Sequence, residues 1–260
     1  MKNKIGVMQG RLLPKYQGRY QAHPVEYWED EFFLAHRLKL DCIEFILDFN
    51  DFERNPLIRN GGIDEIILVS KQAKVEVQTV CLDYLMEAPI HSKNNYIAKS
   101  SQELLKVLLN NVSQLGVTNV VIPCVDQSSL NDELAVNRFI KKLKPLVNIA
   151  EKLKINLSLE TDLAPKPFLN LLECINSNRV TVNYDIGNSA ALGYDVIEEL
   201  DSYGSLITDI HIKDRMLGGG PVELGKGNAD FPLFFDKLKD FDYQGPFIMQ
   251  AYRDEEGVDI

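Results

Sequence analysis

The sequence predicts an α/β fold, a (β/α)8 barrel in which eight parallel strands alternate with helices. Short apolar runs rich in Val, Ile and Leu recur eight times, and longer segments with helical spacing of apolar residues separate them. No low-complexity linker interrupts this alternation. Because 260 residues is also near the usual length of one such barrel, we expect a single domain over residues 1–260.

The apolar runs are four to eight residues long, and most are apolar at consecutive rather than alternate positions. Such runs are typical of strands that are buried on both faces of a parallel sheet covered by helices. The predicted strands span residues 5–8, 42–46, 75–82, 119–123, 155–160, 180–185, 207–212 and 246–250.

The segments between these strands have the spacing of amphipathic helices, and breakers stand where strand–helix units need them. Gly116 ends one helix, Pro165 and Pro167 open another, and Gly245 with Pro246 introduces the last strand. The predicted helices span residues 27–38, 63–73, 96–115, 133–153, 168–175, 196–203 and 233–241.

A doubly wound open sheet is the alternative architecture for this pattern. That fold carries a Gly-rich phosphate turn after its first strand, where this sequence has Gln9-Gly10-Arg11-Leu12. Right-handed crossovers repeated along the whole chain therefore favour the closed barrel.

Charge and composition exclude several classes of function. A formal net charge of -10 repels phosphate backbones, so we expect no nucleic-acid partner. The amino-terminal apolar stretch is too short for a signal peptide, and no stretch approaches the roughly 18 apolar residues of a membrane span. We therefore expect a cytoplasmic protein without a membrane partner. Three of the four cysteines, Cys42, Cys81 and Cys124, lie in or just after apolar runs and are expected to be buried thiols.

Four consecutive predicted strands end in polar residues, namely Glu160, Asp185, His211 and Gln250. In such barrels the active site is built at the carboxyl ends of the strands, and these four ends are neighbours on the rim. Two carboxylates, an imidazole and an amide oxygen suit Mn²⁺, Mg²⁺, Co²⁺ or Zn²⁺. Each residue alone has a structural explanation, as a helix cap or a core histidine, so the prediction of a divalent metal ion rests on the set.

Further polar residues lie near the same rim. Glu44 lies in the second strand and Asp83 follows the third, so both are candidates to contact substrate or to act as a base. The long polar loop after the first strand carries Arg11, Lys15 and Arg19, which suit a lid that contacts a phosphate or carboxylate. The alternative for this loop is a solvated segment kept soluble by its charges.

The segments around the four strand ends resemble a known family. LSLETD surrounds Glu160, VNYDIGNSAALG surrounds Asp185, and DIHIKDR with VELGKGNADFP follows the seventh strand. Over essentially the whole chain the sequence resembles the xylose-isomerase-like TIM barrels, and within them the sugar-phosphate isomerase/epimerase branch.

The resemblance implies a metal-dependent isomerase or epimerase of carbohydrate metabolism that acts on a small sugar or sugar phosphate. It implies that Glu160, Asp185, His211 and Gln250 hold the metal ion, and that Glu160 also transfers protons. It further implies substrate contacts from Asn188, Lys213 and Arg215. Barrels of this family often pair, which leaves a homodimer and a monomer as alternatives.

Gln250 departs from the family pattern, because epimerases have a second Glu there. An amide oxygen can coordinate a divalent ion, but a carboxamide cannot take up a proton near neutral pH. One-base chemistry remains, in which Glu160 removes the proton alpha to a carbonyl and an enediolate forms. The outcome would be isomerisation, an inosose-type dehydration, or epimerisation if Asp83, Asp214 or a metal-bound water supplies a second acid.

Two alternatives lie outside this chemistry. Gln250 also suits a non-catalytic sugar-binding barrel that keeps a degenerate metal site. An endonuclease for abasic sites shares this barrel, but four histidines and a net charge of -10 argue against it.

Overall fold

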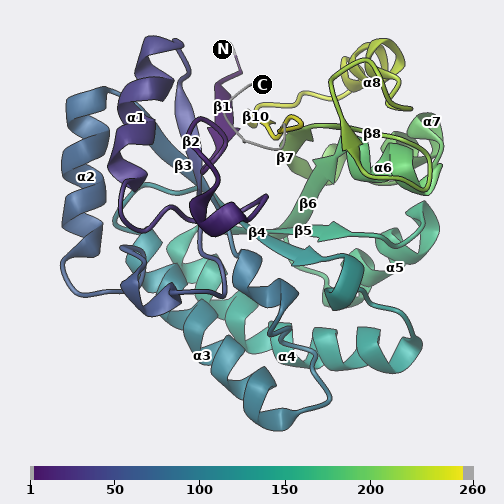
Figure 1. Ribbon diagram of the computed structural model, residues 1–260. Coiled ribbons are helices and arrows are strands. Elements are labelled where there is room, and N and C mark those ends of the chain that lie inside the picture. The colour runs from purple at the N-terminus through teal and green to yellow at the C-terminus, as the bar shows by residue number, and fades with distance from the viewer. Residues whose placement is uncertain (1–2, 254–260) are drawn as a thin grey trace.

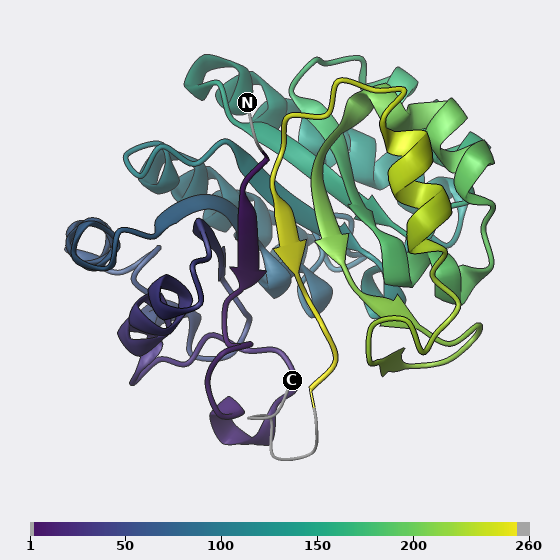
Figure 2. The same cartoon turned by 90° about the horizontal axis from the view of Figure 1, so that it is seen from above.

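The computed structural model describes residues 3–253; residues 1–2 and 254–260, at the ends of the expected domain, lie outside this range. Eight parallel strands form a closed barrel in the order β1-β10-β7-β6-β5-β4-β3-β2 (Figure 1). Figure 2 shows β1 and β10 side by side, where the first and last strands close the ring. The strands are β1 Ile5–Met8, β2 Cys42–Ile46, β3 Glu76–Cys81, β4 Asn119–Cys124, β5 Asn156–Thr161, β6 Val180–Asp185, β7 Ile207–Ile212 and β10 Phe247–Met249.

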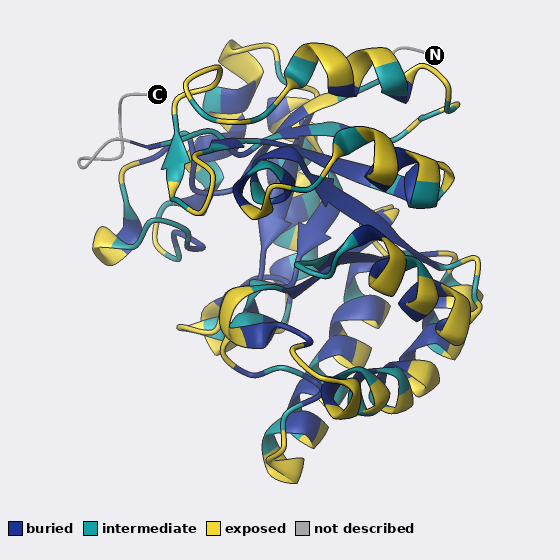
Figure 3. Ribbon diagram, turned by 90° about the vertical axis from the view of Figure 1, so that its right-hand side faces the viewer, coloured by how far each residue is buried: buried dark blue, intermediate teal, exposed yellow. Residues whose placement is uncertain are grey.

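Helices cover the outside of the barrel, with exposed residues on their outer faces and buried strands behind them (Figure 3). The predicted (β/α)8 barrel is confirmed, with element ends that differ by a few residues. The predicted helices appear as α1 Trp28–Arg37, α2 Gly62–Ala73, α3 Asn95–Val112, α4 Glu133–Leu153, α5 Pro165–Ile175, α7 Val196–Tyr203 and α8 Phe231–Leu238. Short 3-10 turns in the described chain are η1 Tyr16–Gly18, η2 Phe52–Arg54, η3 Asp83–Met86, η4 Asp126–Ser128 and η5 Gly204–Leu206.

Two features of the fold were not predicted. Helix α6, Ile186–Leu192, follows β6 directly, and a small antiparallel hairpin pairs β8, Asp214–Arg215, with β9, Pro221–Val222. Both are too short for an apolar period to develop. Helix α6 begins because Asp185 is its N-cap, and the carboxylate accepts a hydrogen bond of 2.8 Å from the backbone N–H of Asn188.

The inside of the barrel is apolar on one side and polar on the other. A cluster of Met8, Cys42, Ile46, Cys81, Val121 and Ile248 fills part of it. Glu44, Asn183, Asp209 and His211 are also fully or almost fully buried. Because burial of charged groups is costly unless they have partners, this polar half marks the part of the barrel shaped by function rather than by packing.

Cys42, Cys81 and Cys124 are buried thiols, as predicted, whereas Cys174 is exposed. No helix within residues 3–253 is long and apolar enough to cross a membrane.

Candidate metal centre

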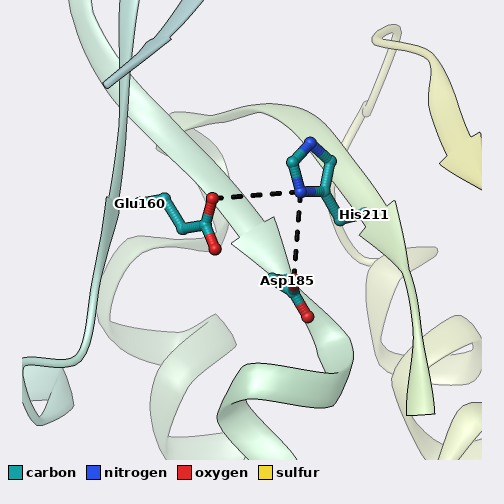
Figure 4. Close-up of side chains that lie close together, drawn as sticks. All are labelled: Glu160, Asp185 and His211. Carbon is teal, nitrogen blue, oxygen red and sulfur yellow. Dashed lines mark ion pairs between the residues drawn. The ribbon is translucent and has the colours of Figure 1, made fainter. Parts of the chain in front are cut away.

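Strands β5, β6 and β7 bring Glu160, Asp185 and His211 together, as predicted. His211 Nδ1 lies 3.9 Å from Glu160 Oε2 and 3.9 Å from Asp185 Oδ2 (Figure 4). One ligand atom from each residue lies within 4.8 Å of the others. Two atoms that bind one ion at about 2.1 Å are up to about 4.2 Å apart, so small side-chain movements would let all three share a divalent cation.

Gln250 lines the same cavity as Glu160 and offers an oxygen. Its backbone N–H donates to Ile212 O at 2.9 Å, which holds it beside the end of β7. Its side-chain Nε2 donates to Gln21 Oε1 at 3.2 Å and contacts Met8 Sδ. The carbonyl oxygen Oε1 is buried and has no hydrogen-bond partner within the described chain. This orphaned acceptor fits a metal ligand better than a structural hydrogen bond.

Glu44 fixes the orientation of the His211 ring from below. Its Oε1 lies 2.8 Å from His211 Nε2, and both side chains are fully buried. This contact turns Nδ1 toward Glu160 and Asp185, and Asn183 Nδ2 lies 3.3 Å from the same Nδ1 and donates to Glu160 Oε2 at 3.2 Å. The structure therefore places Glu44 beneath the candidate ligands, whereas we had expected it to contact substrate at the rim.

The cluster shifts the pKa values of His211 and Glu160. Burial by itself lowers the pKa of His211, but the carboxylates of Glu44, Glu160 and Asp185 outweigh it and raise this pKa to about 10. Burial raises the pKa of Glu160, and Asp185 adds to the rise, while His211 and Lys213 oppose it. An imidazolium beside two carboxylates shows that the site attracts positive charge.

Asn188 links the candidate ligands to the cationic side of the cavity. Its Nδ2 donates to Glu160 Oε1 at 2.6 Å, and its Oδ1 accepts from Lys213 Nζ at 3.2 Å and Arg215 NH1 at 2.8 Å. Gly187 makes this approach feasible, since a Cβ there would lie 2.8 Å from Lys213 Cγ. The predicted substrate contacts Asn188, Lys213 and Arg215 are thus brought together.

A cavity of about 140 Å³ opens at the carboxyl ends of the strands. It is lined by Asp83, Glu160, Asn188, Lys213, Arg215 and Gln250, among others. A larger hollow of about 400 Å³ lies at the amino ends of β5, β6 and β7, beside Asn156 and Val180. Because barrel chemistry is built at the carboxyl ends, the smaller cavity is the candidate active site.

Arg11 and Arg19, two basic residues of the loop after β1, make contacts within the loop and with the neighbouring Asp48. Arg11 is buried, stacks over the Tyr20 ring at 4.6 Å and donates to Gln21 Oε1 at 2.9 Å. Arg19 pairs with Asp48 at 3.1 Å. Arg11 therefore reaches the rim through Gln21.

Asp214 has no oxygen left for acid–base work. Its carboxylate accepts hydrogen bonds from the backbone N–H groups of Gly225, Gly227 and Ala229. These bonds hold the loop after the β8–β9 hairpin, so Asp214 is a structural residue and does not fit the role of a second acid.

Sequence reasoning missed Asn183 and Gln21, which contact the candidate ligands. Asn183 precedes Asp185 by two residues, so both point to the same face of β6. That period of two was a usable signal, whereas Gln21 lies in an irregular loop and carries none.

The chain belongs to the xylose isomerase-like TIM barrel family, whose model matches residues 32–259. It is 25% identical to a putative L-ribulose-5-phosphate 3-epimerase, SgbU, of Haemophilus influenzae, over 98% of this chain and 90% of that protein. It is 26% identical to the L-ribulose-5-phosphate 3-epimerase UlaE of Salmonella typhimurium, over 87% of this chain and 83% of that protein. The expected family and branch are confirmed.

Solved structures share the fold at lower identity. The 3-keto-D-glucoside 4-epimerase YcjR of E. coli superposes with a TM-score of 0.75 at 17% identity, over 98% of this chain and 95% of that one. The IolI protein with a bound zinc atom superposes with a TM-score of 0.76 at 15% identity, over 98% and 91%.

Proposed function

We propose that this protein is a divalent-metal-dependent epimerase or isomerase of a small sugar or sugar phosphate. The observation that carries the proposal is the cluster of Glu160, Asp185 and His211. Glu160 also lines a cavity together with Gln250 and Lys213. The curated relatives, named as sugar-phosphate epimerases, support the enzyme class.

Glu160, Asp185 and His211 Nδ1 would hold the ion, with Gln250 Oε1 as a fourth ligand. A mixed oxygen and nitrogen set suits Mn²⁺, Zn²⁺, Mg²⁺ or Co²⁺. When bound, such an ion stabilises negative charge that develops on neighbouring substrate oxygens.

The protein's own groups supply proton transfer and positioning. Glu160 takes the proton alpha to the substrate carbonyl, and its raised pKa brings it nearer to neutral pH, where a general base is most effective. Asn183 and Asn188 each donate to one of its oxygens, which holds the carboxylate in one orientation. Lys213 and Arg215 bind the anionic or hydroxyl oxygens of the substrate, and the guanidinium suits a phosphate.

Metal analysis and solvent-deuterium incorporation test this proposal. The purified protein is expected to bind one Mn²⁺ per chain and to introduce deuterium alpha to the carbonyl of one ketose in a panel. The panel follows the names of relatives and neighbours and includes L-ribulose 5-phosphate, D-psicose, D-tagatose and D-fructose. A protein that binds no divalent ion and exchanges no alpha proton would end the proposal.

A non-catalytic sugar-binding barrel is the second candidate, and Gln250 is the observation that favours it. Gln250→Glu distinguishes the two. A third carboxylate is expected to tighten Mn²⁺ binding by about tenfold or more, and in an enzyme it also adds a proton acceptor that speeds deuterium exchange. Calorimetry and mass spectrometry measure the two effects, with the exposed Gln244→Glu as the control. A change in metal affinity alone would favour the binding barrel.

A further inference from the structure

Asp83 lies on a wall of the cavity that none of the candidate metal ligands occupies. It opens the turn η3 directly after β3, and in the barrel order β3 stands four places from β7, the strand of His211. Asp83 and Glu160 both line the cavity. They come from β3 and β5, which are two places apart in the barrel order, so their carboxyl groups would reach a bound sugar carbon from different directions.

Gln21 holds Asp83 in place and ties it to Gln250. Gln21 Nε2 donates to Asp83 Oδ1 at 3.0 Å, while Gln21 Oε1 accepts from Gln250 Nε2 at 3.2 Å and from Arg11 NH2 at 2.9 Å. The structure gives Asp83 Oδ2 no hydrogen bond from any residue in the 3–253 range. One oxygen is thus fixed, and the other is available to the cavity.

The surroundings of Asp83 raise its pKa, so that part of the population carries a proton at neutral pH. Burial raises the pKa of Asp83 to about 7, and the charges of Glu87, Asp48 and Glu160 add to the rise, while the hydrogen bond from Gln21 opposes it. Arg11 and the thiol of Cys81 also lie close enough to interact with the charge of Asp83. Burial raises the pKa of Glu160 as well, and His211 and Lys213 oppose that rise. The assignment of the acid therefore rests on the position of Asp83 in the cavity and on its oxygen Oδ2.

We propose that Asp83 is the second proton-transfer group of this site and does the work that Gln250 cannot do. The inference rests on the proposed function. It makes the reaction an epimerisation, since two groups on different walls can add and remove a proton on opposite faces of one carbon.

The step balances. The Glu160 carboxylate takes the alpha proton, the C–H pair becomes the C=C bond of an enediolate, and the carbonyl pair moves to oxygen. The Asp83 carboxylic acid then gives its proton to the other face of the same carbon, and the carbonyl re-forms. Glu160 ends protonated and Asp83 ionised, and exchange with solvent restores both.

The Asp83→Asn variant tests this proposal by comparison with the wild-type protein, with both proteins loaded with Mn²⁺. The substrates are L-ribulose 5-phosphate with its 3-epimer, or D-fructose with D-psicose, whichever pair the wild type interconverts. We expect interconversion to fall about 100-fold. The epimer whose alpha hydrogen faces Glu160 should still exchange deuterium within about threefold of the wild-type rate, as expected for an intact base. The epimer whose alpha hydrogen faces Asp83 should lose deuterium exchange.

Three outcomes would overturn the inference. One is an Asp83→Asn variant that interconverts the epimers at the wild-type rate. Another is equal loss of exchange from both epimers while Mn²⁺ affinity and melting temperature are kept. A wild type that neither binds Mn²⁺ nor exchanges either epimer would instead remove the proposed function, and the inference with it. The amide replaces the carboxyl group at a half-buried position without changing its size, so folding should be preserved.

Glu87→Gln gives a second readout that leaves Asp83 in place. Glu87 is exposed directly after η3, and its charge contributes to the raised pKa of Asp83. Without it, the high-pH limb of the rate profile should move to lower pH, because Asp83 then loses its proton more easily. The exposed Asp64→Asn, on α2, is the control. If the high-pH limb of the rate profile stays in place for Glu87→Gln, Asp83 is not the acid.

Discussion

Glu160→Gln is expected to slow interconversion of the sugar epimers by about 10³-fold while the protein remains folded. The amide has the same size and keeps an oxygen for the hydrogen bond from Asn188. It has no basic site for a proton, so the alpha hydrogen that faces this residue stays on carbon. The hydrogen bond from Asn183 is lost, because the amide nitrogen that replaces the second oxygen donates and cannot accept.

The measurement is kcat at saturating Mn²⁺, with metal content determined on the same sample. Glu173→Gln is a matched control, since Glu173 is exposed on α5 and lines the hollow at the amino ends of the strands, away from the carboxyl ends. If Glu160→Gln, with Mn²⁺ bound, keeps kcat within tenfold of wild type, then Glu160 serves as a ligand and another group is the base.

Most of the candidate site could be predicted from the residues at the ends of the strands. Glu160, Asp185 and His211 each follow an apolar run, and a barrel of parallel strands must bring the ends of consecutive strands together. The convergence in Figure 4 therefore follows from topology and from the position of each residue in its strand. Neither depends on details of packing.

The supporting residues depend on which strands face each other across the barrel. Glu44 is a mid-strand residue, and its contact with His211 needs β2 and β7 to meet through the lumen. The register fixes this contact, and apolar patterning does not report register between distant strands. Glu44 therefore looked like a rim residue in the sequence.

The roles of loop residues are the hardest to predict from the sequence. Asp214 and Arg19 have charged side chains that suggest a role in catalysis or substrate binding. In the structure, Asp214 accepts hydrogen bonds from three backbone N–H groups and Arg19 pairs with Asp48. Which partner such a side chain finds is decided by the path of an irregular loop. Asp83 shows the converse, because its surroundings of burial and like charge arise from η3, the end of β2 and β5 together.

Mn²⁺ affinity is expected to fall about 100-fold when the pH is lowered from 8 to 6. In the metal-free protein the carboxylates raise the pKa of His211 to about 10, so the ring carries two protons throughout this range. Coordination needs the lone pair of Nδ1, which requires release of one proton, whereas the proton on Nε2 stays on the contact with Glu44. Each unit below that pKa then costs about tenfold in apparent affinity.

Glu44→Gln separates this competition from a general effect of pH on the fold. The amide oxygen still accepts from Nε2, but the charge that contributes most to raising the pKa of His211 is gone. The variant should therefore show a shallower dependence over the same range and release less than one proton per Mn²⁺, as measured by calorimetry in two buffers of different ionisation enthalpy. Wild-type affinity that is constant between pH 6 and 8 would mean that His211 is already neutral without metal. In that case no group of the site releases a proton when the cation binds in this range.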